Sequence, residues 1–185
     1  MRKILYVQNV SLDGFIEDSD GKIDWSIPSE ELHWHFNELE RNVDINFYGR
    51  RLSETMDYWL TADQNPEAAD VERDFAEAWR KTERIVFSKT LEKVEGNASL
   101  RREVDPDEIQ KLKNQPGNLL MVGGAGLAST FIKHGLVDEF RVYIYPVVLG
   151  SGKPMFQIEK KLNLNFVESQ TFSGKIMMLK YQLKP

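Results

Sequence analysis

The order of the apolar segments is the feature of this sequence that most constrains its fold. Short apolar runs typical of strands alternate with stretches whose apolar residues recur at helical spacing until about residue 140. After that point, strand-like runs follow one another with short turns. Strands separated by helices pair in parallel, whereas strands joined by tight turns pair antiparallel. The sequence therefore predicts an α/β fold with a mostly parallel sheet, an antiparallel C-terminal hairpin and helices packed on the sheet.

Individual elements can be assigned from the same pattern. Strands are expected at 4–7, 43–48, 84–87, 97–100, 118–122, 140–145, 164–170 and 176–183. Helices are expected from Ser29, as N-cap, to about Asn42, at 71–81, at 106–114 after Asp105, and after the glycines at 123–126. The segment 52–59 is predicted to be a short helix or irregular, and 61–69 to be a loop.

Length and composition restrict the class of protein. The 185 residues show no repeat or linker, so we expect a single domain over 1–185. A formal net charge of -5 argues against nucleic-acid binding, and the absence of cysteine excludes disulfides and thiolate chemistry. The N-terminus becomes polar too soon for a secretory signal, and no apolar run approaches the ~20 residues that span a bilayer. These features predict a cytoplasmic protein without a membrane partner.

Three predicted strands are followed by turns suited to phosphate. These turns are Gly49-Arg50-Arg51, Ser88-Lys89-Thr90 and the run from Gly123 to Leu127. Glycines ahead of a helix let a phosphate reach its free N–H groups, and arginine forks match phosphate oxygens. Each turn alone is also typical of a solvated or tight connection that binds nothing. Ligands of open α/β sheets bind beyond the strand ends, so the three together predict one dinucleotide lying across that edge.

A fourth candidate is the acidic start of the first predicted helix. Glu30 and Glu31 lie between Trp25 and the pair Trp34 and Phe36. One of these carboxylates can hydrogen-bond a polar heterocycle or deliver a proton. Alternatively, both serve only the helix N-terminus, where acidic residues are favoured by the dipole. Which of the two is functional stays open.

The histidines do not predict a metal site. His33 and His35 are two residues apart and lie on different faces of a helix. His134 precedes Gly135 near a predicted helix end, where an imidazole commonly serves the dipole. We therefore expect no metal.

In this order and spacing, the motifs resemble those of the dihydrofolate reductase superfamily. They are more similar to the reductase domain at the C-terminus of the bifunctional riboflavin-biosynthesis deaminase–reductases and its stand-alone bacterial relatives. The resemblance covers nearly the whole chain. It rests on Ser11-Leu-Asp-Gly14, Gly49-Arg50-Arg51, Phe87-Ser88-Lys89-Thr90, Gly123-Gly-Ala-Gly126, Leu136-Val-Asp-Glu-Phe140 and the run from Tyr145 through Gly150-Ser-Gly-Lys-Pro154 to Phe156.

The resemblance implies a dihydrofolate reductase-like three-layer fold with an eight-stranded sheet and helices on both faces. It also implies NADPH as hydride donor and a homodimer. It assigns the pyrophosphate to 123–127, the adenosine 2′-phosphate to the two other turns, and the nicotinamide pocket to Asn9 and Ile16. The expected cofactor residues are Asn9, Ile16, Gly49, Arg50, Arg51, Ser88, Lys89, Gly123, Gly124, Ala125, Gly126 and Leu127. Leu52 stands where the family commonly has threonine.

Two functional hypotheses follow. The first is an NADPH-dependent reductase of a small heterocycle, resembling 5-amino-6-(5-phosphoribosylamino)uracil reductase of riboflavin biosynthesis or a pteridine or dihydrofolate reductase. Glu30 or Glu31 would relay a proton or anchor the substrate. The alternative, motivated by Leu52 and by the unassigned acid, is a non-catalytic dimeric protein of the same fold that binds a nucleotide or heterocycle.

Overall fold

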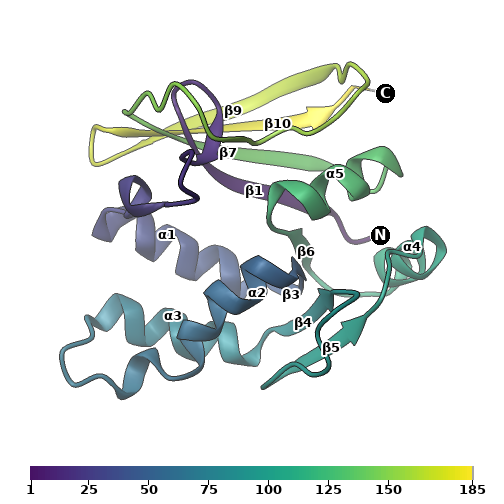
Figure 1. The fold of residues 1–185 in the computed structure, drawn as a ribbon, viewed down its shortest axis with the longest axis horizontal. Helices are drawn as coiled ribbons and strands as arrows, with labels where there is room; N and C mark the ends of the chain where they lie inside the picture. Colours follow the sequence, from purple (N-terminus) through teal and green to yellow (C-terminus); the bar gives the residue numbers. More distant parts are fainter. Residues whose placement is uncertain (185) are drawn as a thin grey trace.

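The computed structural model describes residues 1–184, and its main feature is an eight-stranded sheet (Figure 1). The strand order is β5-β4-β3-β6-β1-β7-β10-β9. The strands are β1 (Ile4–Ser11), β3 (Val43–Gly49), β4 (Glu83–Phe87), β5 (Ala98–Arg101), β6 (Leu119–Val122), β7 (Glu139–Tyr145), β9 (Leu164–Phe172) and β10 (Ile176–Leu183). All neighbours from β5 to β7 pair in parallel, whereas β10 pairs antiparallel with both β7 and β9. The predicted fold class is therefore confirmed.

Helices cover both faces because the chain travels along the sheet in two directions. It moves outward from β1 to β3 and β4 through α1 (Glu30–Arg41) and α3 (Asp70–Lys81). It returns from β5 to β6 and β7 through α4 (Pro106–Asn114) and α5 (Ala125–Lys133). Parallel crossovers are right-handed, so reversing the direction places the second pair of helices on the opposite face.

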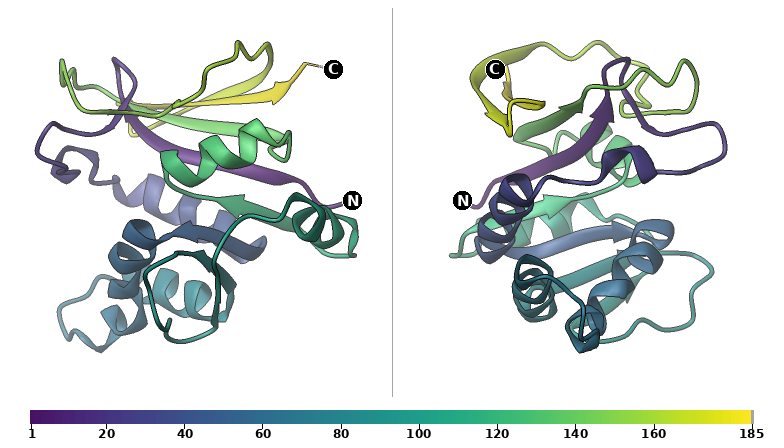
Figure 2. Two further views of the ribbon diagram at one scale, coloured as in Figure 1. Left: turned by 45° about the vertical axis from the view of Figure 1, so that its right-hand side comes forward. Right: turned by 90° about the vertical axis from the view of Figure 1, so that its left-hand side faces the viewer.

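The two faces have separate cores. On the α4–α5 face, Ile109 and Phe131 pack with strand residues such as Tyr6 and Phe47. On the other face, α1 and α3 bury smaller clusters with the sheet, which contain Leu32 and Trp79 respectively. In Figures 1 and 2 the yellow C-terminal hairpin lies at one end of the sheet, and the teal β4–β5 pair lies at the other.

The predicted helix signals act as expected. The Ser29 hydroxyl accepts a hydrogen bond from the Leu32 N–H at 3.3 Å, and the Asp105 carboxylate caps α4. The segment after Gly49 contains α2 (Arg50–Met56), followed by short 3-10 helices at Asp57–Leu60 and Ala62–Gln64. The second of these lies in the segment predicted to be a loop, where no apolar periodicity announces it.

A second, two-stranded sheet joins distant parts of the chain. It pairs β2 (Phe15–Glu17) with β8 (Lys153–Pro154). Gly152 has a φ of +151° and lies where a Cβ would collide with the Glu17 backbone carbonyl. Only glycine allows these two backbones to approach so closely.

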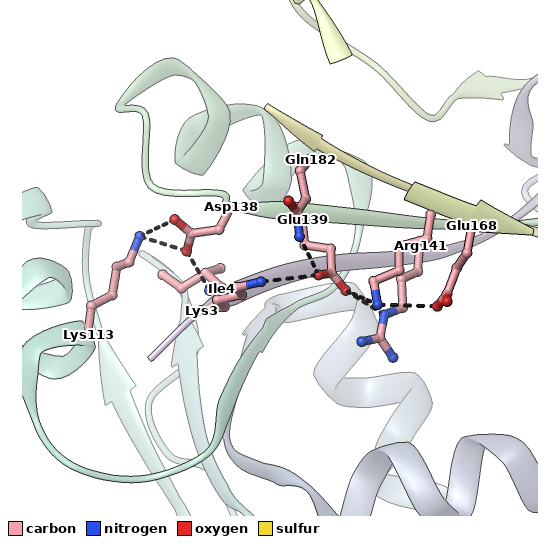
Figure 3. Close-up of polar contacts among 9 residues, drawn as sticks. Lys3, Ile4, Lys113, Asp138, Glu139, Arg141, Glu168 and Gln182 are labelled. Atoms are coloured by element: carbon pink, nitrogen blue, oxygen red, sulfur yellow. Dashed lines mark hydrogen bonds and ion pairs between the residues drawn. The ribbon is translucent and has the colours of Figure 1, made fainter. Parts of the chain in front are cut away.

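A network of buried charges holds the start of β7 (Figure 3). Asp138 accepts hydrogen bonds from the Ile4 N–H at 2.7 Å and from Lys113 Nζ at 2.9 Å. The adjacent Glu139 is 3% exposed and accepts from Arg141 Nε at 2.8 Å, with Lys180 Nζ 3.8 Å away. Because the buried Glu139 carboxylate has cationic partners, its desolvation is compensated, whereas the Asp138 side chain is 31% exposed. The network lies at the opposite end of the parallel strands from the three turns that the sequence singled out.

No helix within residues 1–184 is long and apolar enough to cross a membrane.

Candidate active site

The three turns singled out in the sequence meet at one edge of the sheet. They follow β4, β3 and β6, which are neighbours in the strand order. Gly49 is in register with Phe87, and the Gly123 N–H donates to the Phe47 carbonyl at 3.0 Å. The parallel pairing therefore brings together segments that lie up to about 70 residues apart along the chain.

The glycine turn opens α5 without a side-chain cap. Gly124 is the N-cap residue with a φ of +81°, which L side chains rarely adopt. The N–H groups of the first helical turn, from Ala125 to Leu127, have no acceptor within the helix. A Cβ on Gly123 would collide with Leu52 Cδ2 from α2. No side chain therefore caps these N–H groups, and Leu52 packs against the first glycine of the turn.

The arginine turn carries two exposed guanidinium groups. Arg50 donates to Glu54 at 2.7 Å and to the Thr90 hydroxyl at 3.0 Å, which links this turn to the one after β4. Arg51 pairs with Glu17 of β2 at 3.2 Å. The side chains of Arg50 and Arg51 are 52% and 68% exposed, so both can turn towards a ligand.

The remaining turn is stabilised by its own serine. The Ser88 hydroxyl accepts hydrogen bonds from the N–H groups of Thr90 and Leu91 at 3.2 and 3.0 Å. Ser88 itself is buried, whereas Lys89 is exposed. The structure thus places three cations, those of Arg50, Arg51 and Lys89, at the surface of the edge where the turns meet.

A cavity of about 510 Å³ lies on the α1–α3 face of the sheet, where the glycine turn and α2 contribute to its lining, and we call it the α1–α3 cavity. Asn9, Gly123 and Gly124 line it, whereas Ile16 is 8% exposed in β2 and lies outside its lining. Its aromatic walls are formed by Phe36, Tyr48, Tyr58, Trp59 and Phe75. Hollows of similar volume elsewhere on the described surface have more polar walls. The size and walls of the α1–α3 cavity are typical of a small-molecule site.

Two titratable side chains of α1, those of Glu40 and His33, line the cavity. The sequence analysis did not identify either of them as a site residue. Glu40 is 2% exposed and accepts a hydrogen bond from Asn46 Nδ2 at 2.7 Å. Burial raises the pKa of Glu40 to about 7, although hydrogen bonds from Thr82 and Asn46 oppose the shift. His33 contacts Asn37 Oδ1 at 3.0 Å. A carboxyl next to Leu39 on the apolar stripe of the helix was the available signal for Glu40.

The two candidate acids from the sequence analysis differ from Glu40 in their position. Glu30 and Glu31 are both exposed, and neither belongs to the lining of the α1–α3 cavity. The Glu31 carboxylate accepts hydrogen bonds from the backbone N–H and the hydroxyl of Ser173, at 2.6 and 3.0 Å. Glu31 thus ties the start of α1 to the turn between β9 and β10. A catalytic role for either acid stays a prediction.

Comparison with known proteins gives the family. The RibD C-terminal domain matches residues 2–178. The chain belongs to this family. The uncharacterised protein YyaP of Bacillus subtilis (strain 168) is 35% identical over 182 residues, which is 97% of this chain and 94% of YyaP.

Solved structures support the same assignment for this RibD C-terminal domain. A Shewanella sp. PV-4 protein named after riboflavin biosynthesis is 27% identical, with a TM-score of 0.75 and coverage of 99% of each chain. Dihydrofolate reductase from Enterococcus faecalis, solved with NADP(H), has a TM-score of 0.61 at 11% identity, and the match covers 99% of this chain and 97% of that one. At that identity the likeness shows the fold alone. The resemblance inferred from the motifs is confirmed, and the chain is a reductase-like domain of dihydrofolate reductase-like fold.

Proposed function

We propose that this RibD C-terminal domain is an NADPH-dependent reductase of a small heterocycle. One observation carries the proposal: three phosphate-suited turns meet at the carboxyl ends of β4, β3 and β6, and the glycine turn among them lines an aromatic cavity. An extended dinucleotide has phosphates along its length and a reactive ring at one end. The turns suit its phosphates, and the cavity suits the ring together with an acceptor.

Each group of residues has a defined task in this proposal. The free N–H groups from Ala125 to Leu127 bind the pyrophosphate, with Gly123 and Gly124 admitting it to the backbone. Gly49, Arg50, Arg51, Ser88 and Lys89 form the turns that bind the 2′-phosphate end. Asn9 borders the nicotinamide in the cavity, and the family resemblance assigns Ile16, which lies outside the cavity lining, to the same pocket. When bound, NADPH supplies a hydride to the acceptor.

The protein contributes mainly by positioning. Holding donor and acceptor in contact can contribute about 7–11 kcal/mol to lowering a barrier. A reduction also needs a proton, and His33 and Glu40 are titratable groups on the cavity wall. Glu30 or Glu31 would act from the rim, as a relay or an anchor. We also propose a cytoplasmic homodimer, following the family expectation.

A second function is favoured by one side chain. Leu52 packs against Gly123, where the family commonly supplies a threonine hydroxyl for phosphate. A protein that binds the cofactor or a heterocycle without turnover would tolerate this change. Such a protein would show binding without any oxidation of NADPH.

Two measurements test the proposal. Isothermal titration calorimetry with NADPH is expected to show binding, and the absence of binding at millimolar cofactor would sink the reductase hypothesis. NADPH oxidation is then followed with pteridines, dihydrofolate and ribosylaminopyrimidines as acceptors. Turnover with any of them rules out the non-catalytic alternative, whereas binding without turnover across the panel supports that alternative.

A further inference from the structure

The α1–α3 cavity has walls that suit a flat, weakly polar ring system. Trp59 and Phe75 lie with their ring centroids 4.7 Å apart, and the His33 ring meets each of them nearly edge-on. Tyr48 is held from below by Trp79, whose indole N–H donates to its hydroxyl at 3.1 Å. These contacts fix the walls, because each ring is held by at least one other ring. A planar ligand therefore meets a surface formed in advance.

The charges within the lining of this cavity are one-sided, since the cations of Arg50, Arg51 and Lys89 lie on the turns outside it. Its lining contains no arginine and no lysine among the residues that the structure describes, but it does contain the carboxyl of Glu40. The nearby cation of Arg84 is committed elsewhere. It stacks 4.0 Å above the Trp79 ring and donates to the backbone carbonyls of Trp79 and Glu95 at 3.3 and 3.0 Å.

The charges in the lining decide which ligands can leave water and bind in the α1–α3 cavity. A phosphate or carboxylate that leaves water needs a cation or several N–H donors, otherwise the transfer is strongly unfavourable. The phosphate-suited groups of this protein lie on the turns, where the proposed cofactor occupies them. An anionic group on the acceptor would find a buried carboxyl and aromatic rings instead.

We infer that the acceptor bound in the α1–α3 cavity is an uncharged planar nitrogen heterocycle that carries neither a phosphate nor a carboxylate tail. The inference rests on the proposed function in treating the cavity as the acceptor site. It narrows that function, because it disfavours both a phosphoribosylaminopyrimidine and dihydrofolate. An unphosphorylated pteridine or aminopyrimidine fits the walls and the charge.

The test compares matched ligands on the intact protein. Calorimetric titrations use dihydroneopterin, dihydroneopterin monophosphate and dihydrofolate, each with and without saturating NADPH. The uncharged pterin is expected to bind at least about tenfold more tightly than its phosphate or dihydrofolate. Equal or tighter binding of either anionic ligand overturns the inference, and so does the failure of all three to bind.

A variant tests the cause of the preference. Thr55 is exposed on α2 and lines the cavity, so Thr55→Arg adds the missing cation at a site that tolerates a long side chain. The matched control is Thr171→Arg on β9, where the threonine is also exposed. Thr55→Arg is expected to improve binding of the monophosphate severalfold relative to the control. If the two variants bind it equally, missing positive charge is not what excludes phosphate, and the inference fails.

The same samples separate this inference from the proposed function. Loss of NADPH binding by the unmodified protein would refute the reductase, while the ratio between pterin and pterin phosphate would still test the cavity. Conversely, NADPH oxidation driven by the phosphorylated ligand and not by the neutral one would support a reductase and refute the inference.

Discussion

Glu40 illustrates how a single residue departs from its ordinary chemistry. It lies in the last turn of α1, with Asn46 of β3 as its hydrogen-bond partner and Arg84 of β4 and Tyr48 of β3 as charged or titratable neighbours. Burial dominates these interactions and raises the pKa of Glu40 from 4.5 to about 7. The folded protein therefore keeps a proton that the unfolded chain has already released.

This difference predicts a pH-dependent stability. The stability that protonated Glu40 gives the folded state is fully present below pH 4.5. As the pH rises towards about 7, the free energy of unfolding falls by up to about 3 kcal/mol. Urea unfolding at several pH values is expected to show this loss in the wild-type protein. Glu40→Gln, which cannot ionise, should flatten the curve across that window. Identical pH profiles for the two proteins would contradict the raised pKa.

Arg50 and Arg51 predict cofactor selectivity. Both guanidinium groups are exposed, so they remain available for a phosphate. We expect Arg50→Ala combined with Arg51→Ala to weaken NADPH binding roughly 10- to 100-fold, because a hydrogen bond to a charged group contributes about 1.5–3 kcal/mol. NADH lacks the 2′-phosphate and serves as the internal control in the same calorimetric series. Equal losses for the two nucleotides would show that the arginines do not recognise that phosphate.

At this scale, residue type predicted some positions and not others. Glycines and arginines after strands have chemistry that is local, so the turns at 49–51 and 123–127 were identifiable without a structure. Glu40 and His33 become members of one cavity wall only when α1 packs with α3 and β3, and this packing buries Glu40. The place of Glu40 beside Leu39 on the apolar stripe of the helix indicates burial, but it does not indicate which elements pack against this side chain.

At the scale of elements, predictability followed local signals. The helix at 106–114 begins after a carboxylate cap, and the sequence predicted its bounds. The strand β10 is a single apolar run between turns, and its bounds were predicted as well. The strand β1 runs on to Ser11, beyond the apolar run 4–7, because its pairing with β7 continues to Tyr145. Pairing of this kind depends on a partner that lies far along the sequence.

The opening of α5 gives a prediction with a control in the same turn. Gly124 adopts a φ of +81°, whereas Gly126 has ordinary helical geometry and open space beside it. Gly124→Ala should lower the free energy of unfolding by about 1–2 kcal/mol. Gly126→Ala should leave it unchanged or raise it by up to about 1 kcal/mol. Urea unfolding of both variants checks this, and equal effects would refute the strain argument.

At the scale of the whole molecule, the sequence predicted how strands pair but not their order. The alternation of helices and strands implies parallel neighbours whatever the order. The reversal after β5 that places β6 between β3 and β1 depends on which helix covers which face. The expectation that the sheet has eight strands came from the family resemblance and not from the periodicity of the sequence.

The assembly of the molecule is open to a direct measurement. We predict a homodimer, the state expected for the riboflavin-type reductase domain. The edge strand β9 is consistent with an association, since Phe166 and Val167 are 60% and 42% exposed. Sedimentation velocity over a dilution series should give twice the mass of one chain. A single-chain mass at every concentration would contradict the prediction.

The small β2–β8 sheet affects how often this part of the protein opens. Within β2, Ile16 is buried in the main core, and the Phe15 N–H donates to the Ser11 hydroxyl. Its ladder with β8 consists of only two residue pairs among the described residues, supported by the Met155 N–H to Gly14 carbonyl bond and the Arg51–Glu17 ion pair. Such a segment opens far more often than the strands of the main sheet. Pulse-labelling hydrogen exchange should therefore show amides 15–17 exchanging faster than those of β1; equal rates would refute this.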